Sequence, residues 1–118
     1  MSNVNKMIDE CVSSCLDCMI ACQNCATNAL CQNGMGTCLK LAQECAQVAT
    51  LCSQLMSYKT EYFLELCFIC AEMCHICETE CNKYNYDYTK NCAEACRKTA
   101  SLCRSAISEN NTMNLDRA

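Results

Sequence analysis

Apolar and polar residues follow one another along this chain with a spacing of three and four, the period of an amphipathic helix. In the first such stretch Ile8 shares a face with five cysteines, while Asp9, Asp17 and Gln23 lie off that face. The sequence Asn-Gly-Met-Gly at 33–36 is the clearest turn signal between two stretches. We predict helices at about 4–30, 37–57, 61–83 and 88–108, followed by a polar, frayed tail at 109–118.

These helices predict an all-α fold, an up-down-up-down antiparallel four-helix bundle that forms a single domain. The chain has 118 residues, no proline and only two glycines, so nothing interrupts long helices. At 1.5 Å per residue each helix would span roughly 30–40 Å, and the short connections favour antiparallel neighbours. A small disulfide-rich scaffold built mainly from loops is the less favoured fold.

The seam of each helix that should face the core is occupied by cysteine, where leucine or isoleucine is usual. One dense run consists of Cys11, Cys15, Cys18, Cys22 and Cys25, and the other of Cys67, Cys70, Cys74, Cys77 and Cys81. The remaining two helices carry Cys38, Cys45 and Cys52, and Cys92, Cys96 and Cys103. The bundle should therefore have a core lined with thiols.

Composition limits where such a protein works and what it binds. Seventeen cysteines in 118 residues is typical of a disulfide scaffold or a thiolate metal site. The net charge of −4 argues against nucleic acid and anionic membranes as partners. The first ten residues are polar, and no apolar stretch approaches the roughly 20 residues of a membrane span. We expect a cytoplasmic protein whose thiols stay reduced.

The spacing of the cysteines disfavours disulfides within a helix and favours metal. Residues four apart have Cβ atoms about 5–6 Å apart, whereas a disulfide needs about 3.5–4.5 Å. Two thiolates on opposite sides of one ion lie roughly 4.6 Å apart, which a Cys-x-x-x-Cys pair can reach. An ion that accepts two or three sulfur ligands in a reducing compartment is Cu(I). The five such pairs are Cys11/Cys15, Cys18/Cys22, Cys70/Cys74, Cys77/Cys81 and Cys92/Cys96.

Zinc is the main alternative, in a zinc-thiolate structural or metal-buffering interaction module. It takes four ligands at discrete sites, whereas this chain has thiols at level after level of one core. A thiol redox protein is a third possibility, and it would need a base beside one cysteine. The single histidine, His75, follows Cys74 and should lie about 100° away from the seam. We therefore expect no enzymatic activity.

The doubled pattern Cys11-x-x-x-Cys15-x-x-Cys18-x-x-x-Cys22-x-x-Cys25 and Cys67-x-x-Cys70-x-x-x-Cys74-x-x-Cys77-x-x-x-Cys81 resembles the bacterial copper storage proteins, in their cytosolic branch. The resemblance covers about residues 5–107 and implies a four-helix bundle, usually a homotetramer, whose core thiolates store and buffer many Cu(I) ions. It implies that each Cys-x-x-x-Cys pair binds one ion through two sulfurs. Cross-helix or bridging ligands would come from Cys38, Cys45, Cys52 and Cys103.

One end of the bundle differs from the family pattern. Members of the family often carry histidines near the connections at the mouth of the bundle, whereas this chain has Tyr84, Tyr86 and Tyr88. The first connection supplies two soft side chains, Cys31 and Met35. We predict that copper from a chaperone or a small-thiol donor enters at this end, with Cys31 and Met35 as its first ligands. The alternative for Met35 is that it only caps the core.

Overall fold

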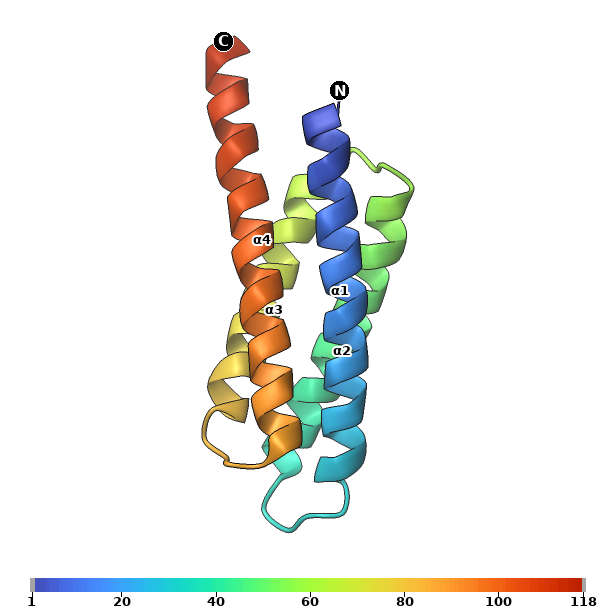
Figure 1. The fold of residues 1–118 in the computed structure, drawn as a ribbon, viewed down its shortest axis with the longest axis vertical. Helices are drawn as coiled ribbons and strands as arrows, with labels where there is room; N and C mark the ends of the chain where they lie inside the picture. The colour runs from blue at the N-terminus through green and yellow to red at the C-terminus, as the bar shows by residue number, and fades with distance from the viewer. Residues whose placement is uncertain (1, 118) are drawn as a thin grey trace.

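Four helices account for nearly all of the chain. The computed structural model describes residues 2–117, with side chains described for 4–110. The helices are α1 (Ser2–Ala29), α2 (Gly36–Ser57), α3 (Phe63–Cys81) and α4 (Asp87–Arg117), and the described residues form no β-strand. Successive helices run in opposite directions (Figure 1). The predicted all-α antiparallel four-helix bundle is therefore confirmed.

The helices form a ring in which each packs against the helix before it and the helix after it, with α4 returning to α1. The molecule is elongated, 53 × 22 × 18 Å. The connections at 30–35 and 82–86 lie together at one end, which we call the two-loop end (Figure 1). The other end, the terminal end, holds both termini and the connection at 58–62 (Figure 1).

The first two connections each use one residue in the left-handed backbone region. In the connection after α1 this residue is Gly34, at φ +79°, where a side chain would be strained. After α2 it is Lys59, at φ +57°, and its backbone N–H donates to the carbonyl of Met56 at 2.9 Å. The hydrogen bond satisfies a carbonyl of the last turn, so α2 stops without a glycine.

Two predicted boundaries of the third helix are shifted inward. It begins at Phe63 instead of 61, because the Thr60 hydroxyl accepts a hydrogen bond from the Tyr62 N–H at 3.2 Å and forms a separate turn. It ends at Cys81 instead of 83.

At the start of α4, the Thr89 hydroxyl accepts a hydrogen bond from the Tyr86 N–H at 3.2 Å and holds the chain at the helix entrance.

The last helix is longer than the predicted range 88–108, because α4 continues as helix to Arg117. Residues 109–117 contain no glycine or proline that would end the helix. The end of α4 rises past the rest of the bundle (Figure 1). Near this point Asn110 Nδ2 donates to the Ala106 carbonyl at 3.0 Å and to Met7 Sδ at 3.5 Å, which connects α4 to α1.

The interior is built from cysteine and alanine, with larger apolar side chains near the ends. Met35 and Met56 are the largest fully buried side chains. Met35 directly precedes α2, at the two-loop end. Met56 lies in the last turn of α2, at the terminal end. Across the described part of the chain, no helix is long and apolar enough to cross a membrane.

A single polar pair interrupts this interior between α1 and α4. The Thr99 hydroxyl donates to the Ser14 carbonyl at 3.1 Å, and the two hydroxyl oxygens are 2.7 Å apart. Since the Thr99 proton is used on the carbonyl, Ser14 donates its own proton to Thr99 Oγ1. Both residues are buried, so the Ser14 hydroxyl depends on Thr99 Oγ1 for its acceptor.

Replacing Thr99 by valine should lower the free energy of unfolding of the metal-free protein by about 1–3 kcal/mol, because the Ser14 hydroxyl loses its acceptor. The double variant Ser14→Ala/Thr99→Val should recover part of this loss. As a control, Thr79→Val removes an exposed hydroxyl that donates to the His75 carbonyl of its own helix, and should change stability by about 0.5 kcal/mol or less. Urea unfolding under a reductant measures all three.

Candidate metal centre

All cysteines except Cys31 are buried, and all seventeen are free thiols. The buried thiols come from all four helices and follow one another along the bundle axis. We call this set the sulfur column: Cys11, Cys15, Cys18, Cys22, Cys25, Cys38, Cys45, Cys52, Cys67, Cys70, Cys74, Cys77, Cys81, Cys92, Cys96 and Cys103. The seam positions predicted from the spacing are thus the core of the bundle.

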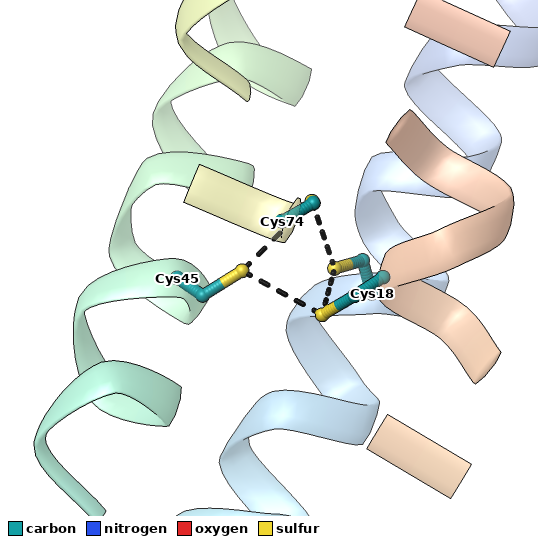
Figure 2. A group of neighbouring side chains, drawn as sticks. Cys18, Cys45 and Cys74 are labelled. Carbon is teal, nitrogen blue, oxygen red and sulfur yellow. Dashed lines mark hydrogen bonds between the residues drawn. The ribbon is translucent and has the colours of Figure 1, made fainter. Parts of the chain in front are cut away.

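In the middle of the column the thiols meet across helices. Cys18, Cys45 and Cys74 converge from α1, α2 and α3 (Figure 2). Sulfur–sulfur distances are 3.7 Å from Cys18 to Cys74 and 3.9 Å from Cys45 to Cys74. Cys96 of α4 completes this group, in which all four sulfurs lie within 4.8 Å of one another. Such a group could hold a metal ion through sulfur alone.

The neighbouring levels share members with this group. Cys96 also belongs to a group with Cys22, Cys77 and Cys92, and Cys92 in turn belongs to one with Cys25 and Cys81. At the two-loop end of the column, Cys38 lies 3.8 Å from Cys25 and 4.0 Å from Cys81. The shared sulfurs make these levels one continuous set of potential ligands.

Towards the terminal end the column continues with fewer sulfurs at each level. Cys15 lies 3.7 Å from Cys70, and the last group consists of Cys11, Cys67 and Cys103. Cys52 donates to the Leu66 carbonyl at 3.7 Å.

In two of the five predicted Cys-x-x-x-Cys pairs, the two sulfurs of the pair lie close to each other. The sulfurs of Cys18 and Cys22 are 3.9 Å apart, and Cys92 and Cys96 share a group within 4.8 Å. The other three pairs share no group within 4.8 Å, although Cys70 acts on the pKa of Cys74, and Cys81 on that of Cys77, through side-chain hydrogen bonds. The groups are therefore formed mainly by thiols from different helices.

Cys31 and Met35 stand apart from these groups. Cys31 is exposed in the connection after α1 and belongs to none of the groups described above. Met35 is 2% exposed and one turn before Cys38 on the same helix face. The lone histidine, His75, is exposed, in agreement with its predicted place off the seam.

Hydrogen bonds between thiols favour one charged sulfur at several levels. Donation from Cys103 and Cys67 lowers the pKa of Cys11 to about 4. Donation from Cys22 and other neighbours lowers the pKa of Cys18. Hydrogen bonds from surrounding thiols have the same effect on the pKa values of Cys70 and Cys77. These sulfurs are the ones best prepared to act as a first thiolate ligand.

Most other thiols of the column are held in the neutral form. The hydrogen bonds that Cys96 donates, to Cys18 first, raise its pKa, and burial raises the pKa of Cys38 above the ordinary value of 9.0. A column with few charges can fold without metal, because neutral thiols pack as small apolar side chains.

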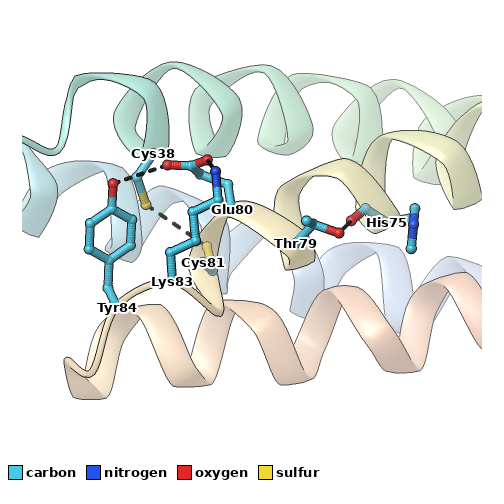
Figure 3. A network of polar contacts seen from close by, with 7 residues as sticks. All are labelled: Cys38, His75, Thr79, Glu80, Cys81, Lys83 and Tyr84. Carbon is cyan, nitrogen blue, oxygen red and sulfur yellow. Dashed lines mark hydrogen bonds and ion pairs between the residues drawn. The ribbon is translucent and has the colours of Figure 1, made fainter.

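The two-loop end has a polar network that the sequence did not indicate. Glu80 precedes Cys81 and is 6% exposed. Its carboxylate accepts a hydrogen bond from the Tyr84 hydroxyl at 3.0 Å and pairs with the Lys83 ammonium at 3.0 Å (Figure 3). The Cys38–Cys81 contact lies beside this network (Figure 3). The seam pattern could not reveal Glu80, because a position next to the seam is usually solvated.

A bundle whose interior is a continuous column of reduced thiols is a polynuclear binding protein for a soft metal ion. Comparison with known proteins identifies the metal. The family model described as copper storage protein matches residues 4–108, and this chain belongs to that family. The predicted family and the predicted storage function are thereby confirmed.

Individual relatives agree with this assignment. The uncharacterized cysteine-rich protein YhjQ of Bacillus subtilis is 37% identical over 100 residues, which are 82% of this chain and 93% of YhjQ. The Cu(I)-bound copper storage protein BsCsp3 is 35% identical with a TM-score of 0.81, covering 86% of this chain and 98% of its own. A cytosolic copper storage protein from Streptomyces lividans, with five coppers, is 26% identical with a TM-score of 0.87, covering 92% and 98%.

Proposed function

We propose that the sulfur column is the compartment in which this chain stores Cu(I), several ions per chain, and that its thiols are the ligands. The observation that carries the proposal is the sharing of Cys92 and Cys96 between successive groups, which suits ions of low coordination number placed one after another. Each thiol that becomes a ligand releases its proton to solvent, so copper uptake should weaken as pH falls. The role proposed is storage without catalysis.

One specific observation favours zinc as an alternative metal for this compartment. The group of Cys18, Cys45, Cys74 and Cys96 has the number of sulfurs that a tetrahedral ion needs. The next group along the column also uses Cys96, so two separate four-sulfur sites cannot both be complete there. A zinc protein of this kind would bind few ions, whereas a Cu(I) store would fill the column.

Anaerobic titration of the reduced protein with Cu(I) and, separately, with zinc distinguishes these functions. Storage predicts that Cu(I) is bound tightly in competition with a chromogenic chelator until the number of ions approaches the number of thiols. It also predicts a helical circular dichroism spectrum before metal is added. Uptake that stops at a few zinc ions, with an unfolded metal-free chain, would contradict the proposal.

We further propose a cytosolic location and a homotetramer, with copper delivered by a chaperone or a small thiol. Free thiols throughout the core fit a reducing compartment, and the Streptomyces relative is a cytosolic protein. Exposed apolar side chains such as Leu16, Ile20 and Phe68 offer surface for contacts between copies. Light scattering after gel filtration measures the oligomeric state.

Copper is proposed to enter at the two-loop end through Cys31 and Met35. Cys31 presents an exposed thiol to a donor, and the buried Met35 ends that connection, three residues before Cys38. The double variant Cys31→Ser/Met35→Leu should load Cu(I) several-fold more slowly while reaching the same final copper content, measured by stopped-flow absorbance. Met56→Leu, at the opposite end, is the matched control. An unchanged loading rate in the double variant would exclude this entry route.

A further inference from the structure

A groove between α1 and α4 brings the surface up to the sulfur column at the terminal end, where these two helices lie side by side (Figure 1). It has a volume of about 380 Å³, and Met7 and Cys11 line it from α1. Opposite them α4 contributes Ala106, whose small side chain leaves room between the helices. Cys11 belongs to the last group of the column, with Cys67 and Cys103. Because Cys11 is only 1% exposed, an ion in the groove would first meet a ligand other than this thiol.

Met7 supplies a soft ligand at this place. It lies four residues before Cys11, the same step that separates the Cys-x-x-x-Cys pairs, so the two side chains are neighbours on one face of α1. Met7 is half-buried and packs against the apolar core. Thioether and thiolate sulfur are the protein ligands that select Cu(I). An ion held by Met7 Sδ is therefore one helical turn away from a thiol of the column.

The thioether of Met7 is held in position by α4. Asn110 Nδ2 donates to Met7 Sδ at 3.5 Å and to the Ala106 carbonyl at 3.0 Å, so the amide is fixed at both contacts. A thioether sulfur has two lone pairs, so one can accept the N–H while the other binds an ion. A ligand that is already oriented loses less conformational entropy when it binds.

We infer that Met7 is a Cu(I) ligand at a second entrance to the sulfur column, from which the ion passes to Cys11 and the group that it forms with Cys67 and Cys103. The inference rests on the storage function proposed above. This group lies at the far end of the column from the two-loop entrance, so a second entrance supplies it directly. In the transfer, Cu(I) leaves its donor for Met7 Sδ and then binds the sulfur of Cys11, whose proton passes to water. The copper stays in the Cu(I) state throughout.

Met7→Leu tests this entrance, because leucine keeps the size and apolar character of the side chain but has no sulfur. Met19→Leu is the matched control, since Met19 is another half-buried methionine of α1 that packs against the core. Both changes are made in the Cys31→Ser/Met35→Leu variant, in which the two-loop entrance lacks its proposed ligands. With Cu(I) supplied as its glutathione complex, Met7→Leu should slow loading a further several-fold in stopped-flow absorbance. Met19→Leu should leave the rate unchanged, and neither should alter the final copper content.

Met7→Cys distinguishes a ligand from a packing residue. Cysteine is smaller than methionine but keeps a sulfur that binds Cu(I), so this variant should load at least as fast as the chain with Met7. Slow loading in both Met7→Leu and Met7→Cys would indicate a packing role and would overturn the inference. Equal loading rates in Met7→Leu and Met19→Leu would also overturn it, while leaving storage intact. Failure of the parent chain itself to take up Cu(I) would instead contradict the proposed function.

Discussion

Cys96→Ser is expected to release copper from two levels of the sulfur column at once. Cys96 is the sulfur shared by the group of Cys18, Cys45 and Cys74 and the group of Cys22, Cys77 and Cys92. A serine hydroxyl has nearly the same shape but is a poor ligand for Cu(I). Because a direct ligand is lost, the weakening at both levels should exceed the about 10- to 100-fold typical of outer-shell changes. Competition against a Cu(I) chelator measures it.

Two other serine variants make this result specific. Cys103→Ser removes a sulfur that belongs to one group, so it should release less copper than Cys96→Ser. Cys31→Ser removes the exposed thiol and should leave the equilibrium copper content unchanged. Circular dichroism of each metal-free variant confirms that it folds. Equal copper content in all three variants would contradict the assignment of shared ligands.

The sequence predicts which face of each helix carries the thiols but not which thiols meet. A spacing of three and four places Cys67 and Cys74 on one face, whatever the neighbouring helices do. The contact between Cys18 and Cys74 depends on how far α1 is displaced along the axis relative to α3, which tertiary packing decides. For this reason the predicted pairs within a helix are only part of the groups that the structure shows.

Helix boundaries that depend on local sequence signals could be predicted, whereas features that depend on tertiary packing could not. The turn at Gly34 is a local signal and was predicted correctly. The helix beyond residue 109 was missed because polar composition alone does not end a helix, and no glycine or proline does so there. The buried Glu80 could not be predicted, since its burial depends on how the connections fold over the end of the bundle.

The metal-free bundle should become less stable as pH rises from about 9 to 12, and the copper-loaded bundle should not. The hydrogen bond between Cys103 and Cys67 lowers the pKa of Cys67. The hydrogen bond that the Cys67 thiol donates to Cys11, together with burial, outweighs this effect and raises that pKa from 9.0 to about 12. Between these values the folded chain holds a proton that the unfolded chain has lost, so rising pH favours unfolding. Each thiol of this kind should lower the free energy of unfolding by roughly 1.4 kcal/mol for every pH unit between its pKa in the unfolded chain and its pKa in the folded chain.

Thiols whose pKa is lowered do not cancel this loss. For Cys11, with a pKa of about 4, the contribution to stability is complete once the pH exceeds 9.0, so it adds no slope above that value. Copper-bound thiolates have no proton to lose, so the loaded protein provides the control for ionisation of exposed tyrosines and lysines. Urea unfolding of both forms at pH 8 to 12 under a reductant measures the difference. A metal-free stability that stays level over this range would mean that the buried thiols are not held neutral, and that the bundle tolerates charge in its core before copper arrives.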